Sequence, residues 1–330
     1  MRKPDVDNAA LRRLLARIFT HSADLQWERT PDGVSTQVYR IFHGRETFYL
    51  RVAEDEAASL APEAALHTEL LARGVSVPEV THFERFDEGL RRSVLVTSEI
   101  AGAPMVRHGD GGSVLDIDVP DPDALPGIYR AAGRDLARLN KVPVDGFGWV
   151  IRDGVASLRG ECASYAEWAA PYDPAELRLF GFSARHIDQA AELLSRQVAA
   201  GPAGRAALLA HGDFDLTHVF HRHGRYTGII DFGEIRGSEG WFDLAMFGLM
   251  RLPEAEGPSL AAVRYLEEGY AEISPLPADY RLRLLRTAVL IVANRLIRGY
   301  LRRGPGEMQK PWFTRDCGQL GKLLTETAKH

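Results

Sequence analysis

Residues 208–220 read LLAHGDFDLTHVF, and residues 226–234 read YTGIIDFGE. In each segment an apolar run typical of a short strand leads into a polar loop that contains aspartate. If the two runs lie side by side, Asp213 and Asp231 emerge near one another. Two carboxylates at the mouths of adjacent strands can divide the chemistry, because one accepts a proton from a hydroxyl while the other binds a hard cation through oxygen.

The composition is typical of a soluble globular protein. The chain has 330 residues, 45% hydrophobic and 26% charged, and no segment approaches the roughly 18 uninterrupted apolar residues that a membrane-spanning helix needs. The net charge of -5 and the lack of a long basic run argue against nucleic acid as a partner. The chain has two cysteines, and residues 1–5 lead into a charged helix rather than an apolar signal core. We therefore expect a cytoplasmic protein with no membrane partner.

The pattern of the chain predicts a small β-rich lobe over residues 1–99 and a larger, mainly helical lobe over residues 100–330. A stretch rich in Gly, Asp and Pro follows the boundary at residues 108–127 and reads as a linker or exposed loop. Asn8 is the expected cap of the first helix. Helical and β-rich patterns alternate in the small lobe, at residues 8–19, 36–42, 46–52, 61–73 and 93–97. The larger lobe has helical patterns at residues 129–140, 184–199, 241–250, 259–273 and 279–302, with short β-like pieces at 206–210 and 226–231.

The order of two short motifs suggests a family. The His-Gly-Asp sequence at residues 211–213, followed by Asp-Phe-Gly at 231–233, resembles the aminoglycoside phosphotransferase family. The resemblance implies an α+β, bilobal, protein-kinase-like fold, with ATP or GTP as phosphoryl donor and Mg²⁺ as cofactor. It also implies that Asp213 orients the acceptor hydroxyl as a catalytic residue, with His211 beside it shaping the same loop, and that Asp231 binds magnesium bridging the nucleotide phosphates.

One position departs from the family pattern. The residue five positions after the catalytic aspartate is usually an asparagine that serves as a second metal ligand, and here it is His218. Imidazole prefers softer ions than magnesium, whose usual partners are oxygens. Three roles for His218 remain open, which are metal ligation, a hydrogen bond to a phosphate, and positioning of the loop.

Four residues of the small lobe match the nucleotide-binding positions of the family. Ser35 and Thr36 lie where the family has its phosphate-covering loop. Arg51 occupies the strand position of the usual lysine and brings a fixed charge with bidentate reach to phosphate oxygens. The resemblance implies that Glu63 pairs with Arg51, with Glu69 as the alternative partner.

Two further segments have roles by the same resemblance. Glu99 and Ile100 lie between the lobes, where backbone groups of the family meet the nucleotide base. Asp243 matches an aspartate that is commonly structural, so we expect its carboxylate to brace the catalytic loop rather than to react.

The resemblance also implies a hydroxylated small molecule as acceptor, because the family phosphorylates antibiotics such as aminoglycosides and macrolides as well as metabolite alcohols. Acidic residues in the C-terminal half favour a cationic acceptor and thus an aminoglycoside. They are Glu234, Glu239, Glu254, Glu256, Glu267 and Glu268. An aromatic set favours a flatter, more apolar acceptor such as a macrolide. It comprises Tyr165, Trp168, Tyr172, Phe180 and Phe182.

Two other functions are weighed against the small-molecule kinase. A non-catalytic nucleotide sensor is consistent with the unusual His218. A protein kinase is disfavoured, because the motif is His-Gly-Asp rather than His-Arg-Asp and no Ala-Pro-Glu segment lies between Asp231 and Trp241.

Overall fold

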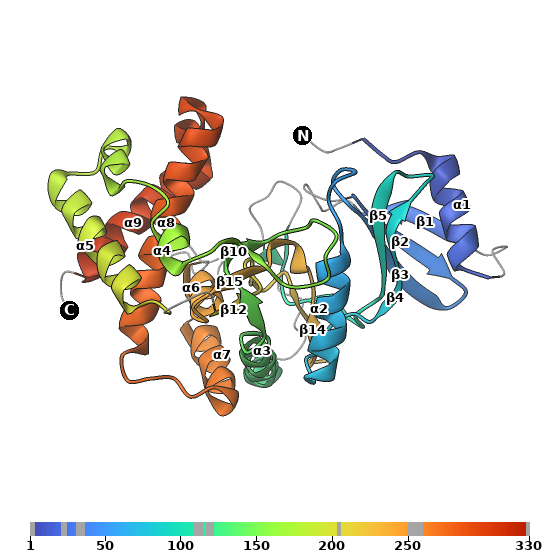
Figure 1. Cartoon of the computed structure of the whole chain (residues 1–330). Helices are drawn as coiled ribbons and strands as arrows, with labels where there is room; N and C mark the ends of the chain where they lie inside the picture. The colour runs from blue at the N-terminus through green and yellow to red at the C-terminus, as the bar shows by residue number, and fades with distance from the viewer. Residues whose placement is uncertain are drawn as a thin grey trace. The chain divides into compact units, whose positions relative to one another are not determined.

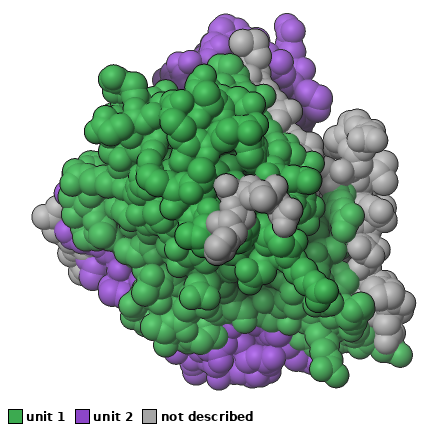
Figure 2. Space-filling view, turned by 90° about the vertical axis from the view of Figure 1, so that its right-hand side faces the viewer, with its two compact units in different colours: residues 1–128, 150–158, 216–232 green, residues 129–149, 159–215, 233–330 purple. Residues whose placement is uncertain are grey.

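The computed structural model describes residues 4–20, 25–30, 37–108, 115–116, 122–202, 206–249 and 260–327. The chain forms two compact units that are each discontinuous in sequence (Figure 2). Unit 1 comprises residues 1–128, 150–158 and 216–232. Unit 2 comprises residues 129–149, 159–215 and 233–330. Because segments from the C-terminal half join unit 1, these contact units do not follow a single cut of the chain at residues 99 and 100.

Unit 1 is built on a five-stranded antiparallel sheet in the order β1-β2-β3-β5-β4. Val94 and Val96 on β5 face a core with Leu11, Leu14 and Leu15 of α1. The intervening Leu95 packs with residues of α2, because successive strand side chains point to opposite faces. Figure 1 shows α1 and α2 on the two faces of this sheet. The elements are α1 (Asn8–Ile18), β1 (Gln26–Arg29), β2 (Gln37–His43), β3 (Glu46–Val52), α2 (Ala61–Ala72), β4 (Val80–Asp87) and β5 (Arg92–Ser98).

The start of α1 corrects a detail of the sequence prediction. The side chain of Asp7, rather than that of Asn8, caps the helix by accepting a hydrogen bond from the backbone amide of Ala10 at 2.7 Å. The cap lies one residue earlier because Asn8 already has helical geometry. The β2–β3 hairpin forms as predicted, with Gly44 at its turn in the left-handed region at φ 62°.

A second sheet of unit 1 contains segments that are far apart in sequence. Its order is β14-β13-β6, so residues near 103 pair with residues near 220. Gly102 permits this pairing, because a Cβ at that position would lie 2.0 Å from the carbonyl oxygen of His221. The remaining elements of unit 1 are β6 (Ala103–Pro104), β7 (Arg107–His108), β8 (Leu115–Asp116), η2 (Pro122–Ala124), β13 (Val219–Arg222) and β14 (Arg225–Ile229).

Unit 2 combines a sheet in the order β11-β10-β15-β12-β9 with a set of helices. The long helix α8 packs against α5, α6 and α9 and is buried from Thr287 to Ala293 (Figure 1). The strands are β9 (Pro143–Asp145), β10 (Phe147–Val150, whose last residue counts with unit 1), β11 (Gly160–Cys162), β12 (Ala206–Ala210) and β15 (Arg236–Ser238). The α-helices are α3 (Leu125–Leu139, which begins in unit 1), α4 (Tyr165–Ala169), α5 (Ala184–Ala200), α6 (Phe242–Leu249), α7 (Leu260–Ile273), α8 (Tyr280–Arg303) and α9 (Pro311–Thr327). Short 3-10 segments are η3 (Pro174–Phe180), η4 (Phe232–Glu234) and η5 (Pro305–Gln309).

The mixture of antiparallel sheets and helices confirms the predicted α+β class. In the part of the chain that the structure describes, no helix is long and apolar enough to cross a membrane. The two motif strands, β12 and β14, do not pair with each other, so the condition stated in the sequence analysis is not met. β12 lies between β15 and β9, so both of its edges are occupied, whereas β14 pairs with β13 in another sheet.

Candidate active site

The loop after β12 is fixed by one buried carboxylate. The backbone amide of His211 donates to Oδ2 of Asp243 at 2.8 Å, and that of Gly212 donates to Oδ1 at 2.9 Å. Asp243 has no exposed surface, and it comes from α6, the helix that follows β15. The bracing contact predicted for Asp243 is therefore confirmed. It places Asp213 directly after two anchored amides.

Two more residues of unit 2 fix this loop. Asn140, at the end of α3, donates from Nδ2 to Oδ2 of Asp243 at 2.9 Å and to the carbonyl of Leu209 at 2.8 Å. The backbone of Gly212 has φ 86°, and a Cβ there would lie 1.9 Å from the carbonyl oxygen of Glu234, so the loop requires glycine. Asn140 is not identified in the sequence analysis, and its bond to Asp243 is visible only in the structure.

His211 is completely buried and lies edge-on to Phe214, with ring centroids 5.8 Å apart. Because the His211 side chain has no exposed surface, it supports the loop by packing inside the protein. The side chain of Asp213, by contrast, is partly exposed.

We expect Asp243→Asn to destabilise the protein by about 3 kcal/mol, because a buried charged acceptor of three hydrogen bonds is lost and its donors are left short of a partner. Denaturant unfolding followed by far-UV circular dichroism measures the change. Asp188→Asn, which alters an exposed carboxylate on α5 of the same unit, is the matched control and should leave the unfolding midpoint unchanged. Equal midpoints for both variants would show that the bracing contact contributes nothing.

A second cluster of predicted residues lies in unit 1. Arg51 donates from Nη1 to Oε1 of Glu63 at 2.6 Å and from Nη2 to Oδ1 of Asp231 at 2.9 Å. Nε2 of His218 lies 3.7 Å from Oδ2 of Asp231. The predicted Arg51–Glu63 ion pair is thus confirmed, whereas Glu69 pairs with Arg73 at 2.6 Å.

The electrostatics of this cluster favour a permanently charged Arg51. Burial disfavours its charge, but the carboxylates of Glu63 and Asp231 more than offset burial and raise the pKa of Arg51. The side chain of Glu63 is 5% exposed and that of Asp231 is 45% exposed. Asp231 also has φ 64°, a left-handed backbone that is uncommon outside glycine and that clusters at functional sites. Asp231 is therefore the accessible carboxylate of the cluster.

The structure describes only part of the remaining predicted nucleotide-binding set. Ser35 and Thr36 lie outside the described residues. The carboxylate of Glu99 accepts from Arg40 at 2.9 Å and from the hydroxyl of Tyr49 at 3.3 Å. The backbone amide of Glu99 donates to the carbonyl of Thr47 at 3.2 Å. Asp213 belongs to unit 2 and Asp231 to unit 1, so the joint action of the two aspartates stays a prediction.

Asp213 lines a cavity of about 390 Å³ that is built entirely from unit 2. Two residues of the predicted aromatic set, Trp168 and Tyr172, line it. Tyr165 is instead buried against Phe147 and Trp168. The other lining residues of this acceptor cavity are Trp149, Glu161, Cys162, Glu167, Pro171, Gly212, Glu234, Arg236, Phe242, Met246, Leu290, Ile291, Asn294, Arg295, Arg298 and Arg302.

The last two aromatic residues of the predicted set also lie in other contacts. Phe180 packs edge-on against Tyr300 and Phe313, and Phe182 lies against His186.

The acidic residues proposed to attract a cation are mostly engaged elsewhere. Glu234 lines the acceptor cavity but pairs with Arg236 at 3.2 Å and accepts from Nε1 of Trp149 at 2.8 Å. Farther along the chain, Glu267 pairs with Arg281, and Glu268 with Arg130. Glu254 and Glu256 lie outside the described residues.

Glu239, the remaining member of the acidic set, is half-buried against α8, with its Oε2 shielded from solvent. Its Oε1 accepts from the hydroxyl of Thr287 at 2.8 Å, and its Oε2 has no hydrogen-bond partner among the described residues. Burial raises the pKa of Glu239 to about 7, from an ordinary value of 4.5. The carboxyl is therefore more easily protonated in the folded protein than in the unfolded chain.

We expect Glu239→Gln to stabilise the protein at pH 8 and not at pH 4. Below pH 4.5 the glutamate is neutral in both the folded and the unfolded state, so its ionisation does not change the free energy of unfolding. Between pH 4.5 and 7 the unfolded chain loses the proton first, and wild type loses up to about 3 kcal/mol of stability. The difference in unfolding free energy between variant and wild type should thus grow across this window. A difference that stays constant from pH 4 to pH 8 would contradict the assignment.

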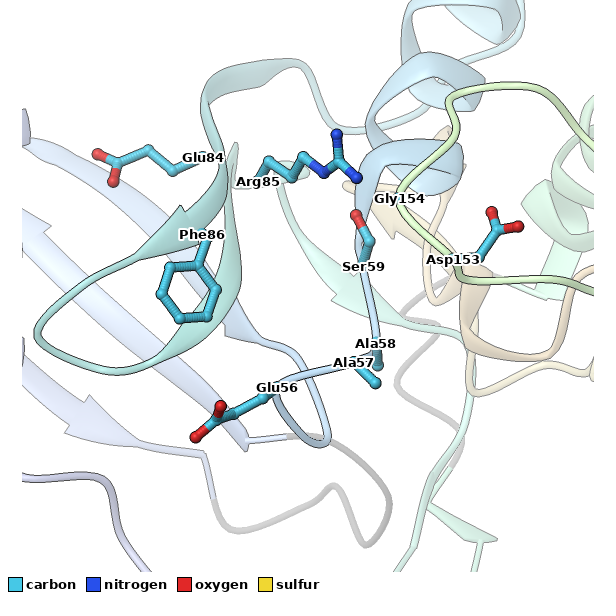
Figure 3. Close-up of a pocket in the computed structure, with 9 residues that line it drawn as sticks. All are labelled: Glu56, Ala57, Ala58, Ser59, Glu84, Arg85, Phe86, Asp153 and Gly154. Carbon is cyan, nitrogen blue, oxygen red and sulfur yellow. The ribbon is translucent and has the colours of Figure 1, made fainter.

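A separate cavity of about 500 Å³ lies in unit 1. Figure 3 shows Arg85 extending from β4 toward Gly154 and Ser59. None of the residues that line this cavity belongs to the predicted nucleotide or catalytic set. It therefore contributes nothing to the candidate active site.

The fold is that of solved kinase-like phosphotransferases. A crystal structure of aminoglycoside phosphotransferase APH(4)-Ia has a TM-score of 0.66 at 15% identity, covering 97% of this chain and 99% of that one. A thermostable mutant of it, in ternary complex with ADP and hygromycin B, has a TM-score of 0.65 at 16% identity and covers 96% and 98%. A candidate fructosamine-3-kinase from Thermobifida fusca has a TM-score of 0.57 at 15% identity and covers 92% and 94%.

The family follows from the sequence itself. Residues 26–280 match the model of the phosphotransferase enzyme family, APH. The match spans more than half of the chain, so the protein belongs to the phosphotransferase enzyme family and is a small-molecule kinase. No curated protein matches the sequence.

Proposed function

We propose that the protein transfers the γ-phosphoryl group of ATP or GTP to a hydroxyl of a small molecule in a magnesium-dependent reaction. The observation that carries the proposal is the position of Asp213. It follows two amides anchored on buried Asp243, and it lines a cavity of about 390 Å³ beside aromatic side chains. A mostly concave, aromatic-lined cavity of this size suits a small molecule. The ADP bound by the similar ternary complex supports a nucleotide donor.

The proposed reaction is an in-line displacement without a covalent enzyme intermediate. The acceptor oxygen forms a bond to the γ-phosphorus while the bond to the β–γ bridging oxygen breaks, and the nucleoside diphosphate leaves. Asp213 orients the attacking hydroxyl and accepts its proton. Arg51, held by Glu63, binds phosphate oxygens through its fixed charge.

The residues of unit 1 suit magnesium in part. Magnesium commonly takes one or two carboxylates and completes its shell with water and phosphate oxygens. Asp231 supplies an accessible carboxylate, and His218 lies 3.7 Å from it as the second group of the site. When bound, magnesium neutralises charge on the nucleotide phosphates. Because imidazole is a softer ligand, the site has one fewer hard oxygen than the family pattern.

Other parts of the proposal rest on the resemblance. Ser35 and Thr36 would cover the phosphates, and the backbone of Glu99 and Ile100 would meet the base. Residues 1–99 would form the nucleotide lobe and residues 100–330 the acceptor lobe, in a cytoplasmic enzyme without nucleic acid or membrane partners.

The acceptor class has support of two kinds. The sequence favours an aminoglycoside, and the similar ternary complex contains hygromycin B. The carboxylates that the structure describes give less support to a polycationic acceptor than the sequence does. Glu267 and Glu268 are ion-paired, and the carboxyl of Glu239 is shielded from solvent.

A nucleotide-consumption screen tests the proposal. Purified protein is incubated with ATP or GTP and a panel of aminoglycosides, macrolides and metabolite alcohols, with magnesium present or removed by chelation. We expect consumption that requires both an acceptor and magnesium. Tight nucleotide binding without consumption across the whole panel would favour a nucleotide sensor instead.

A further inference from the structure

Two of the arginines that line the acceptor cavity have no ion-pair partner among the described residues, while the formal charges of the whole lining balance. Four arginines line it, together with four carboxylates. Two of the arginines are already matched, because Arg236 pairs with Glu234 at 3.2 Å and Arg295 pairs with Asp316 at 2.5 Å. Among the acids, Glu167 accepts from the backbone amides that precede α4. The arginines left over are Arg298 and Arg302, both on α8.

Arg298 is half-buried and has no carboxylate within ion-pair distance among the described residues. Its guanidinium instead lies over the ring of Trp149, 4.3 Å from the ring centroid. Burial and the charge of Arg302 lower the pKa of Arg298, while Tyr172, Glu234 and Glu161 act in the opposite direction. The positive charge is therefore partly removed from water without a carboxylate at ion-pair distance, and an anion that binds there would offset this desolvation.

The helix places these charges on the face of α8 that lines the cavity. Arg295, Arg298 and Arg302 are spaced three and four residues apart, which puts them on one side of a helix. Ile291 and Asn294 lie on the same side and also line the cavity. Like charges at this spacing repel one another, and of the three only Arg295 has an ion-pair partner among the described residues, Asp316.

We propose that the acceptor is a hydroxylated molecule with an anionic group, a carboxylate, sulfonate or phosphate, that binds to Arg298 and Arg302. Its apolar part lies against Trp149, Trp168 and Tyr172, and its hydroxyl faces Asp213. Guanidinium groups bind such planar or tetrahedral oxyanions in bidentate geometry. A polycationic acceptor would instead bring ammonium groups next to unmatched arginines. This inference rests on the proposed function for the identity of the ligand as an acceptor.

Three probes of nearly equal size distinguish the effect of ligand charge on binding from the effect of ligand shape. They are para-hydroxymethyl benzoate, the corresponding benzamide, and para-hydroxymethyl benzylamine, which carry negative, neutral and positive groups. Binding to the full chain without nucleotide is measured by calorimetry or ligand-observed NMR. Wild type is compared with Arg298→Gln, Arg302→Gln and the conservative Arg298→Lys. Arg303→Gln is the matched control, because Arg303 is the next residue of α8, is exposed and does not line the cavity.

We expect wild type to bind the benzoate about tenfold or more tightly than the benzamide, which is the effect of one charge-assisted hydrogen bond. The preference should disappear in Arg298→Gln, fall in Arg302→Gln, survive in Arg298→Lys and remain complete in Arg303→Gln. Equal binding of the three probes, a preference for the benzylamine, or no binding at millimolar concentration would overturn the proposal. Thermal unfolding midpoints close to wild type establish that the variants fold.

The same probes distinguish this inference from the proposed function. If the benzoate is preferred in the binding assay but no acceptor in the panel is phosphorylated, the anionic subsite stands and the kinase proposal fails. If a cationic acceptor is phosphorylated efficiently and the benzoate is not preferred, the kinase proposal stands and the anionic subsite fails.

Discussion

Asp213→Asn should lower kcat by roughly three orders of magnitude, which is the usual contribution of a positioned general base. The amide has nearly the same shape as the carboxylate but neither accepts the proton of the attacking hydroxyl nor orients it through a charge-assisted bond. Because Asp213 lines the acceptor cavity while the loop is fixed by Asp243, the substitution should leave the fold and the acceptor affinity intact. Steady-state kinetics with the best acceptor of the screen, with calorimetric acceptor binding alongside, measure the effect.

The control for this variant is again Asp188→Asn, which removes an exposed charge from the same unit without touching the cavity. It should retain wild-type kcat. If Asp213→Asn kept kcat within tenfold of wild type, Asp213 would not be the residue that aligns the acceptor.

Asp231→Asn should reduce kcat/KM for the nucleotide by a similar factor and raise the magnesium concentration needed for half-maximal rate. An amide oxygen is a weaker ligand of a hard cation than a carboxylate oxygen. The substitution also removes the 2.9 Å ion pair between Asp231 and Arg51, so the guanidinium keeps Glu63 as its partner. Initial rates across a magnesium titration, at fixed nucleotide and acceptor, give both quantities.

Glu69→Gln provides the comparison for Asp231. It removes an exposed carboxylate of α2 that pairs with Arg73, one helical turn away. Its magnesium titration should superimpose on that of wild type. An Asp231→Asn enzyme with an unaltered magnesium requirement would remove Asp231 from the metal site and leave His218 without its proposed partner.

Local patterns predicted the elements that depend on neighbours in sequence. The amphipathic spacing of Leu11, Leu14 and Leu15 gave the first helix, and the two β-rich runs around residue 44 gave the hairpin. Local patterns do not show which strand another strand pairs with, because the partner can lie far away in sequence. The sequence leaves open whether β12 and β14 lie side by side, and in the structure each bonds to strands that no short-range pattern identifies.

The site shows the same limit at the level of single residues. Motifs indicated Asp213, Asp231 and Asp243, because their residue types and order are specific. Asn140 was missed because its bond to Asp243 joins positions 103 residues apart. The stripe of Arg298 and Arg302 was read only as part of a helix, since nothing in the sequence shows which face of α8 lines the cavity.

The charge of the acceptor is where the structure changes the expectation most. A run of glutamates after Asp231 favoured a cation, but sequence alone does not show that Glu267 and Glu268 already have arginine partners. In the cavity, the residues without an ion pair among those described include two arginines, Arg298 and Arg302, both on α8.

The central claim is transfer of a phosphoryl group to a hydroxyl, and mass spectrometry of the acceptor tests it most directly. The enzyme is supplied with magnesium, the best acceptor and ATP or GTP whose γ-phosphate carries heavy oxygen. We predict an acceptor that gains one phosphoryl group with the label, in wild type and not in Asp213→Asn. Label found only in free phosphate, or equal labelling of the acceptor by both proteins, would contradict the account.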